Sequence, residues 1–172
     1  GLPLGLVAAA DAPDAPNIVF DIETARLVID THGYATLTVG PERTPWGASP
    51  YPLVRLDTPD ETLVPENVSA EGNRLTAVFP GGGVCEIAVE PGAGFAVFEM
   101  TRLDAPEATR LRLLSLSVPG GAEIMHTLNA ARAHGHIVAL QATEINVRAY
   151  PQTLGGRASN RAGCSHEFVP TE

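Results

Sequence analysis

Two short motifs place histidine and cysteine where they could bind a metal ion. His134-Gly-His136 precedes one expected strand, and Cys164-Ser-His166 lies in a polar segment near the end of the sequence. Imidazole and thiolate are ligands that zinc and copper accept. A structural zinc site shows tighter paired spacing than H-x-H combined with C-x-H, so we predict no metal site and no bound cofactor.

Acidic residues are spread over the expected strands, which raises the question of acid–base catalysis. They are Asp21, Glu23, Asp30, Glu86, Glu90, Glu99 and Glu144. A glycosidase needs two carboxylates about 5–9.5 Å apart, and no spacing in the sequence brings such a pair together. The chain also lacks a Gly-x-Ser-x-Gly elbow. We therefore assign no catalytic residue, and a small glycosidase or lyase that uses strand carboxylates stays as an alternative.

An aromatic loop is the strongest candidate for ligand binding. Trp46 is the only tryptophan and lies between Pro45 and Gly47, with Tyr51 and Arg55 nearby. Aromatic rings stack on the C–H faces of sugars, and a guanidinium donates hydrogen bonds to hydroxyls or to an acidic sugar. We expect Trp46, Tyr51 and Arg55 to bind carbohydrate. The alternative is that Trp46 plugs one end of the fold.

The segments that must position these residues read as β-strands. The clearest are 94–103, 110–118 and 136–148, which are rich in β-branched or aromatic residues and bounded by Gly, Pro, Asp or Asn. Regular strand–turn–strand spacing predicts an all-β fold, an antiparallel β-sandwich with at most one short helix. Residues 122–133 show helical spacing, and a strand plus a loop is the alternative there.

Two hairpins are expected within this pattern. Segments 25–30 and 34–39 flank a turn at 31–33, with Leu27 and Ile29 sharing one face. A second hairpin is expected around Glu71-Gly-Asn73. The proline-rich stretch 40–52 is expected to cross the surface as a loop, because proline cannot donate to a sheet ladder.

Composition bounds the class of protein. The 172 residues are 44% hydrophobic and 18% charged, which is typical of one globular domain, placed at 17–172. The net charge is −9 and every basic residue is arginine. An acidic chain lacks the positive surface that nucleic acid requires, so nucleic acid is not expected as a partner. No stretch approaches the roughly 20 apolar residues of a membrane span.

Residues 1–16 are interpreted as a leader. The first ten resemble the end of a secretory signal peptide, with a flexible leader or an edge strand as the alternative. On this basis we predict a secreted or periplasmic protein. In an oxidising compartment Cys85 and Cys164 would form a disulfide worth about 4 kcal/mol in the entropic view. The alternative is a buried thiol plus an exposed one.

Part of the chain resembles a known kind of domain. The resemblance is carried by Phe95-Ala-Val-Phe-Glu-Met100, residues 111–118, Leu128-Asn129 and residues 137–147. They resemble the N-terminal β-sandwich ahead of the catalytic barrel in large secreted bacterial glycoside hydrolases, a domain similar to the galactose-mutarotase-like supersandwiches. The catalytic His and Glu pair of the mutarotases themselves has no counterpart in this sequence.

The resemblance implies a non-catalytic, carbohydrate-associated module. Such a module binds a polysaccharide or oligosaccharide, or packs on a catalytic domain of the same parent protein. The remaining alternative is a structural or assembly domain of a cell-envelope or multi-subunit protein. That alternative predicts a large exposed apolar patch.

Overall fold

A computed structural model describes residues 17–47, 49–125, 130–141, 147–154 and 157–167, with side chains in the first three of these ranges. Apart from a short 3-10 turn at Pro80–Gly82, its regular elements are β-strands, and all their pairings are antiparallel. This confirms the all-β prediction. The described residues form no helix long and apolar enough to cross a membrane.

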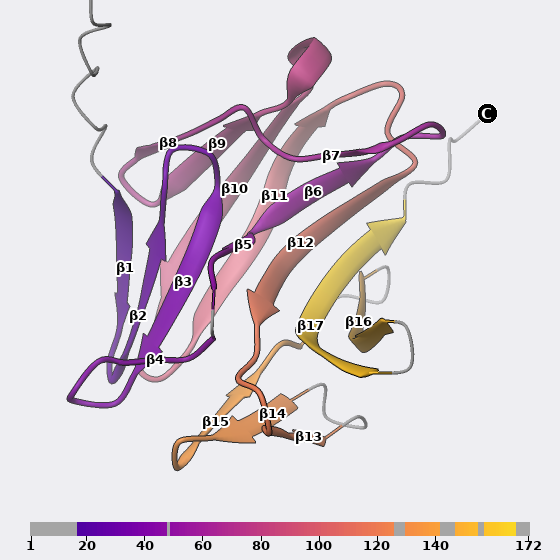
Figure 1. Cartoon of the computed structure of the whole chain (residues 1–172). Helices are drawn as coiled ribbons and strands as arrows, with labels where there is room; N and C mark the ends of the chain where they lie inside the picture. Colours follow the sequence, from indigo (N-terminus) through magenta and orange to yellow (C-terminus); the bar gives the residue numbers. More distant parts are fainter. Residues whose placement is uncertain (1–16, 48, 126–129, 142–146, 155–156, 168–172) are drawn as a thin grey trace, which may run out of the picture.

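Four sheets build a β-sandwich-like fold (Figure 1). Sheet A consists of β1 (Ile18–Ile22), β2 (Ala25–Ile29), β3 (Tyr34–Val39), β4 (Thr44–Pro45) and β5 (Tyr51–Pro52). Sheet B consists of β6 (Val54–Asp57), β7 (Thr62–Leu63), β12 (Arg110–Ser117), β16 (Val147–Leu154) and β17 (Arg157–Glu167). Sheet C consists of β8 (Asn67–Glu71), β9 (Arg74–Val78), β10 (Val84–Pro91) and β11 (Ala96–Asp104). The small sheet D consists of β13 (Glu123–Met125), β14 (Ala130–Ala133) and β15 (His136–Ala139).

Sheets A and B are joined through the backbone of Leu53. Its N–H donates to the carbonyl oxygen of Gly33 at 2.9 Å, next to β3, and its own carbonyl accepts from the N–H of Ser115 in β12 at 3.2 Å. The two sheets therefore continue as one curved layer. Sheet C lies behind this layer in Figure 1, and sheet D lies below it.

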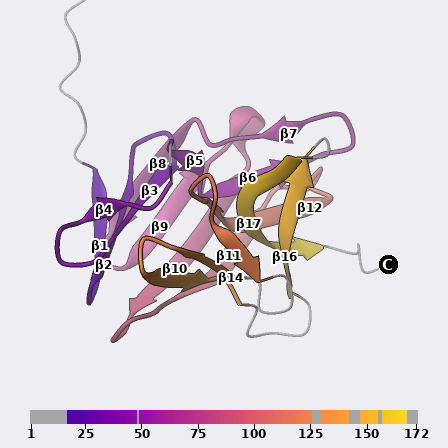
Figure 2. The same ribbon diagram turned by 60° about the horizontal axis from the view of Figure 1, so that its bottom comes forward.

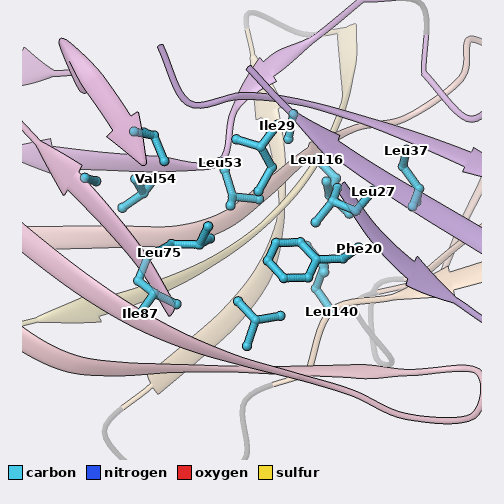
Figure 3. Close-up of a cluster of buried hydrophobic side chains, with 14 of the residues drawn as sticks. Phe20, Leu27, Ile29, Leu37, Leu53, Val54, Leu75, Ile87, Leu116 and Leu140 are labelled. Atoms are coloured by element: carbon cyan, nitrogen blue, oxygen red, sulfur yellow. The ribbon is translucent and has the colours of Figure 1, made fainter. Parts of the chain in front are cut away.

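One hydrophobic core lies between the layers. Leu27 and Ile29 point into it from β2, with 3% and 0% of their surface exposed, which confirms the predicted face. Leu75 and Ile87 enter the same core from sheet C, and Figure 3 shows them close to Phe20. The period-2 alternation of apolar residues builds this core, because successive strand residues point to opposite faces.

The predicted hairpins form. Strands β2 and β3 pair with Leu27 opposite Leu37, and β8 and β9 pair with Glu71 opposite Arg74. At the first turn, Asp30 Oδ1 accepts from the backbone N–H groups of His32 and Tyr34, both at 2.9 Å. A short polar side chain that binds the backbone in this way explains why the chain reverses there.

Four stretches differ from expectation. Residues 40–52 are not purely loop, because β4 and β5 each pair briefly with β3. Segment 122–133 contains β13 and β14, which pair with each other, so the strand alternative is correct there. The predicted strand 136–148 ends as β15 at Ala139, and a separate strand, β16, begins at Val147. The polar segment 157–167 is strand β17, which lies between β12 and β16.

Candidate functional site

An apolar pocket opens at one end of the core. Its volume is about 210 Å³, and its walls come from the ends of sheet A, the start of β11, the middle of β12 and strand β15. We call it the β11–β15 pocket, after the two strands that form its outer walls. Among the described strands, β11 is an edge strand of sheet C and β15 is an edge strand of sheet D. Figure 2 turns the bottom of Figure 1, with sheet D, toward the viewer.

The floor of the pocket belongs to the core. Leu27, Leu37, Val39, Leu116 and Leu140 line it, and all five are buried. Among the lining side chains, only Thr24 and His136 carry polar atoms. The His136 ring lies against Gly40, where an added Cβ would come within 2.9 Å of Nε2. A floor of this kind selects for an apolar group, since an unpaired polar group buried there would lose its hydration.

The rim of the pocket carries two exposed apolar side chains. Phe95, between β10 and β11, is 59% exposed, and Ile137 of β15 is 63% exposed. The Phe95 ring folds over Gly92, so closely that an added Cβ at Gly92 would overlap it. The absence of a side chain at Gly92 therefore allows Phe95 to lie at the pocket entrance.

The backbone around the pocket contains residues in the left-handed region. Leu114, which lines the pocket, has φ 60°, and it lies where the pairing of β12 with β17 shifts register. Glu23 in the β1–β2 turn has φ 48°, and His134 in the β14–β15 turn has φ 50°. A bulky residue such as leucine pays a conformational cost in this region. Glu23 and His134 belong to two-residue hairpin turns, in which a positive φ is the usual geometry. The unusual backbone position beside the pocket is therefore Leu114.

Three carboxylates lie near this end of β11, one beside the pocket entrance and two on the outer face of sheet C. Glu23 Oε2 is 3.1 Å from where a Cβ would stand at Gly94, Glu90 lies opposite Val97, and Glu99 follows the lining residue Phe98. All three are exposed. Among the described side chains, no arginine forms an ion pair with any of them. Glu23 therefore places a negative charge beside the entrance, while Glu90 and Glu99 make the outer face of the β10–β11 edge acidic, because successive strand residues point to opposite faces.

No family model, no curated protein and no solved structure matches this chain. The resemblance to an ancillary module of glycoside hydrolases thus remains an expectation from the sequence.

The predicted carbohydrate site is arranged differently from the expectation. Trp46 is 1% exposed and belongs to the core, where it meets His134 edge to face. Its faces are not available to a sugar, so the structure supports the alternative in which Trp46 fills the end of the fold. The sequence indicated an unusual aromatic residue but not which way the loop turns it.

Tyr51 and Arg55 are brought together, but their contacts are internal. The Arg55 guanidinium lies 4.9 Å from the centre of the Tyr51 ring, and its Nη2 donates to Ser115 Oγ at 3.4 Å. Tyr51 is 9% exposed and Ser115 is 2% exposed. The pair holds β5 and β6 to β12. Carbohydrate binding by Tyr51 and Arg55 stays a prediction from the sequence.

The predicted disulfide is not formed, because Cys85 is a free thiol. Cys85 points into the core from β10 of sheet C and is 0% exposed. Burial, with a smaller effect from the charge of Glu86, raises the pKa of this thiol to about 12. The backbone of Cys164 pairs with Leu113 in sheet B, and the side chain of Cys164 lies outside the described ones. Cys85 is thus the buried thiol of the alternative interpretation.

Two of the seven strand carboxylates considered for catalysis, Asp21 and Glu86, are held by arginines. Glu86 bridges Arg74 at 3.1 Å and Arg102 at 3.2 Å. Asp21 pairs with Arg26 at 2.7 Å, and this hydrogen bond lowers the pKa of the Asp21 carboxyl. Glu144 lies outside the described residues. Such pairs hold neighbouring strands in register, which accounts for these carboxylates.

The histidine motif is divided between two structural contacts. His134 meets Trp46, and His136 lines the pocket. In the part of the chain with described side chains, no three His, Cys, Asp or Glu residues lie close enough to hold a metal ion. The side chain of His166 is not among those described.

Sequence reasoning missed the residues that line and surround the pocket. The sequence did contain a signal for Ile137. In residues 136–140 apolar side chains occupy both the odd-numbered and the even-numbered positions, so one set must lie on the outer face of the strand. Val138 and Leu140 face inward, which leaves Ile137 on the outer face. An apolar residue in the solvent phase of a strand can indicate a contact surface.

Proposed function

We propose that this domain is a protein-interaction module in which the β11–β15 pocket receives a bulky apolar side chain from a partner protein. The observation that carries the proposal is the pair Phe95 and Ile137, more than half exposed at the rim of an apolar pocket. Complete burial of such a side chain stabilises by about 1.5–3 kcal/mol. A partner that covers Phe95 and Ile137 therefore gains binding free energy from the burial of both side chains.

The size of the pocket supports a side chain as the occupant. Its volume of about 210 Å³ compares with about 150 Å³ for an engineered apolar cavity that binds benzene. Sites for larger organic ligands occupy about 300–1,000 Å³. One aromatic ring or one branched aliphatic group fits this space. Only two lining side chains, those of Thr24 and His136, offer hydrogen-bonding groups to a sugar ring.

The proposal keeps one part of the expectation from the sequence. A module that packs on a catalytic domain of the same parent protein is an interaction module, and the pocket gives it a contact surface. It also agrees with the assembly-domain alternative, which predicts exposed apolar residues. Carbohydrate binding and secretion remain predictions from the sequence.

Selection from a displayed library of random decapeptides tests the proposal. We expect peptides that share one bulky apolar residue to be enriched on the full chain. The double variant Phe95→Ser/Ile137→Ser is expected to bind them at least about ten-fold more weakly, because the rim supplies much of the apolar contact. Fluorescence anisotropy with the synthetic peptides measures the affinities.

The matched control is Val19→Ser, since Val19 is also an exposed apolar residue, at 47%, and does not line the pocket. It should bind the peptides as the wild type does. If no peptide is enriched, or if the double variant binds equally well, the proposed function is wrong. A glycan panel run in parallel tests the carbohydrate prediction. Glycan binding that depends on Phe95 would replace the proposed function with carbohydrate recognition.

A further inference from the structure

The two halves of edge strand β11 differ in what protects them. In the second half Thr101 is an extra residue without a partner on β10, because Glu86 pairs with Arg102 and Ile87 with Met100. Arg102 and Asp104 add exposed charges there. Bulges and charges are the usual means by which an edge strand is kept from pairing with another chain. The first three residues, Ala96–Phe98, carry neither a bulge nor a charge, and the exposed Glu99 follows them.

The opposite edge of the same sheet is protected. The N–H of Val68 in β8 donates to the carbonyl oxygen of Thr31 at 2.6 Å, so a turn of sheet A covers that edge. The first half of β11 pairs with β10 alone among the described strands. It also lines the pocket through Ala96 and Phe98. An unprotected stretch of edge therefore lies directly beside an apolar pocket.

We propose that the partner segment binds as an added β-strand along Ala96–Phe98, with its apolar anchor in the β11–β15 pocket and Lys or Arg beside the anchor. This inference rests on the proposed function and specifies the occupant. Main-chain hydrogen bonds to an edge give affinity, while alternate side chains give specificity. Because strand side chains alternate between faces, one residue enters the pocket and its neighbours point away.

The charge around this edge favours a basic segment. Glu23 lies beside the pocket entrance, Glu90 and Glu99 lie on the outer face of the edge, to which the neighbours of the anchor would point, and the whole chain has a net charge of −9. Like charges placed across strands disfavour pairing, and opposite charges favour it. An acidic segment is therefore repelled, and a basic one is attracted in a salt-dependent manner.

Synthetic forms of the tightest library decapeptide separate the steps of this inference. One form carries alanine at the anchor. In a second form the N–H groups of the odd-numbered residues are N-methylated, and in a third form those of the even-numbered residues. Successive N–H groups of a strand point to opposite edges, so each of these forms has one edge blocked. Binding to the full chain is measured by anisotropy. We expect one N-methylated form to bind at least about ten-fold more weakly and the other nearly unchanged, because an added strand uses one of its two edges.

The outcomes distinguish failure of the inference from failure of the proposed function. If alanine at the anchor leaves affinity unchanged, the proposed function itself is wrong. If alanine at the anchor weakens binding but the two N-methylated forms have equal affinities, the pocket is still the binding site. In that case the peptide does not bind as an added strand, and the inference is wrong. A concentration-dependent dimer that Phe95→Ser abolishes, seen by sedimentation, would assign the edge to a second copy of this chain and overturn the partner segment.

The basic character of the segment has its own test. Glu99→Gln should weaken binding of the decapeptide about two- to five-fold and reduce its salt dependence. The matched control is Glu71→Gln, an exposed carboxylate on the opposite edge strand of the same sheet. Equal effects of the two variants, or enrichment of acidic peptides from the library, would overturn this part of the inference.

Discussion

The His134 ring meets the Trp46 indole edge to face, with ring centres 6.5 Å apart and planes at 78°. His134 belongs to the turn between β14 and β15, and Trp46 belongs to the loop that follows β4. This contact attaches the small sheet D to the buried end of sheet A. Because β15 forms one wall of the pocket, the contact also holds that wall in place.

His134→Ala should loosen sheet D without unfolding the sandwich. Loss of an edge-to-face pair costs about 0.5–1.5 kcal/mol. We expect faster amide exchange in β14 and β15 and a red shift of Trp46 emission, since water reaches the ring. His32→Ala is the matched control, because His32 is exposed in a turn of sheet A. Unchanged exchange in His134→Ala would show that other contacts position sheet D.

Trp46→Ala should be among the most destabilising single changes. The ring is 1% exposed, and removal of a large buried aromatic side chain costs about 3–5 kcal/mol. Trp46→Phe keeps most of the apolar volume and should cost less. Urea unfolding followed by circular dichroism measures both, since the change removes the only tryptophan. A loss below about 1 kcal/mol in Trp46→Ala would mean that the ring is not a core residue in solution.

Cys85 should make stability fall at alkaline pH. Burial raises the pKa of its thiol to about 12, whereas an unfolded cysteine has a pKa of about 8.5. The folded protein thus holds this proton more tightly, so its contribution is complete below about pH 8.5. This contribution to the free energy of unfolding is lost as the pH rises from about 8.5 to about 12, at up to about 1.4 kcal/mol per pH unit. Urea unfolding at several pH values measures the slope.

The control for this slope is Cys85→Ala. In this variant the part of the stability loss at alkaline pH that comes from the thiol should disappear, and only the part that comes from other titratable groups should remain. A thiol reagent gives a second measurement. In a Cys164→Ser background, Cys85 should react slowly in the native protein and rapidly in denaturant, because the thiolate is the nucleophile. Rapid reaction of the native protein would contradict the buried position.

Asp57→Asn should destabilise more than loss of an exposed ion pair. Asp57 accepts from Arg112 at 2.7 Å, and the two side chains are 13% and 22% exposed. Loss of a charged hydrogen-bond partner at such a site costs about 1–3 kcal/mol. Asp21→Asn breaks pairs that are about half exposed and should destabilise the fold much less, because solvent screens exposed charges. Unfolding at low and high salt should separate the two, since screening acts mainly on the exposed pair.

The sequence pattern predicted the fold where one face of a strand is buried. Leu27 and Ile29 alternate with polar or half-buried neighbours, and the structure places both in the core. Strand β17 escaped detection because 157–167 contains almost no apolar residue, and its place between two strands comes from tertiary pairing. Local propensity carries no information about such pairing.

The candidate site was less predictable. Trp46 was correctly singled out as unusual, but the direction of its ring depends on the turn after β4 and on a histidine about ninety positions later in the chain. Phe95 and Ile137 come from different sheets and meet at one pocket only after the layers pack. No spacing along the sequence encodes that meeting.

The bridge at Leu53 has a consequence for how quickly the chain folds. One residue connects Gly33 and Ser115, which are far apart in sequence, and the curved layer closes only when all three segments are in place. Long loops must therefore close before these hydrogen bonds form, at an entropic cost. Proteins dominated by such distant pairings fold in roughly milliseconds to seconds. Until the Leu53 bridge forms, edges of sheets A and B that it later joins stay open to other chains.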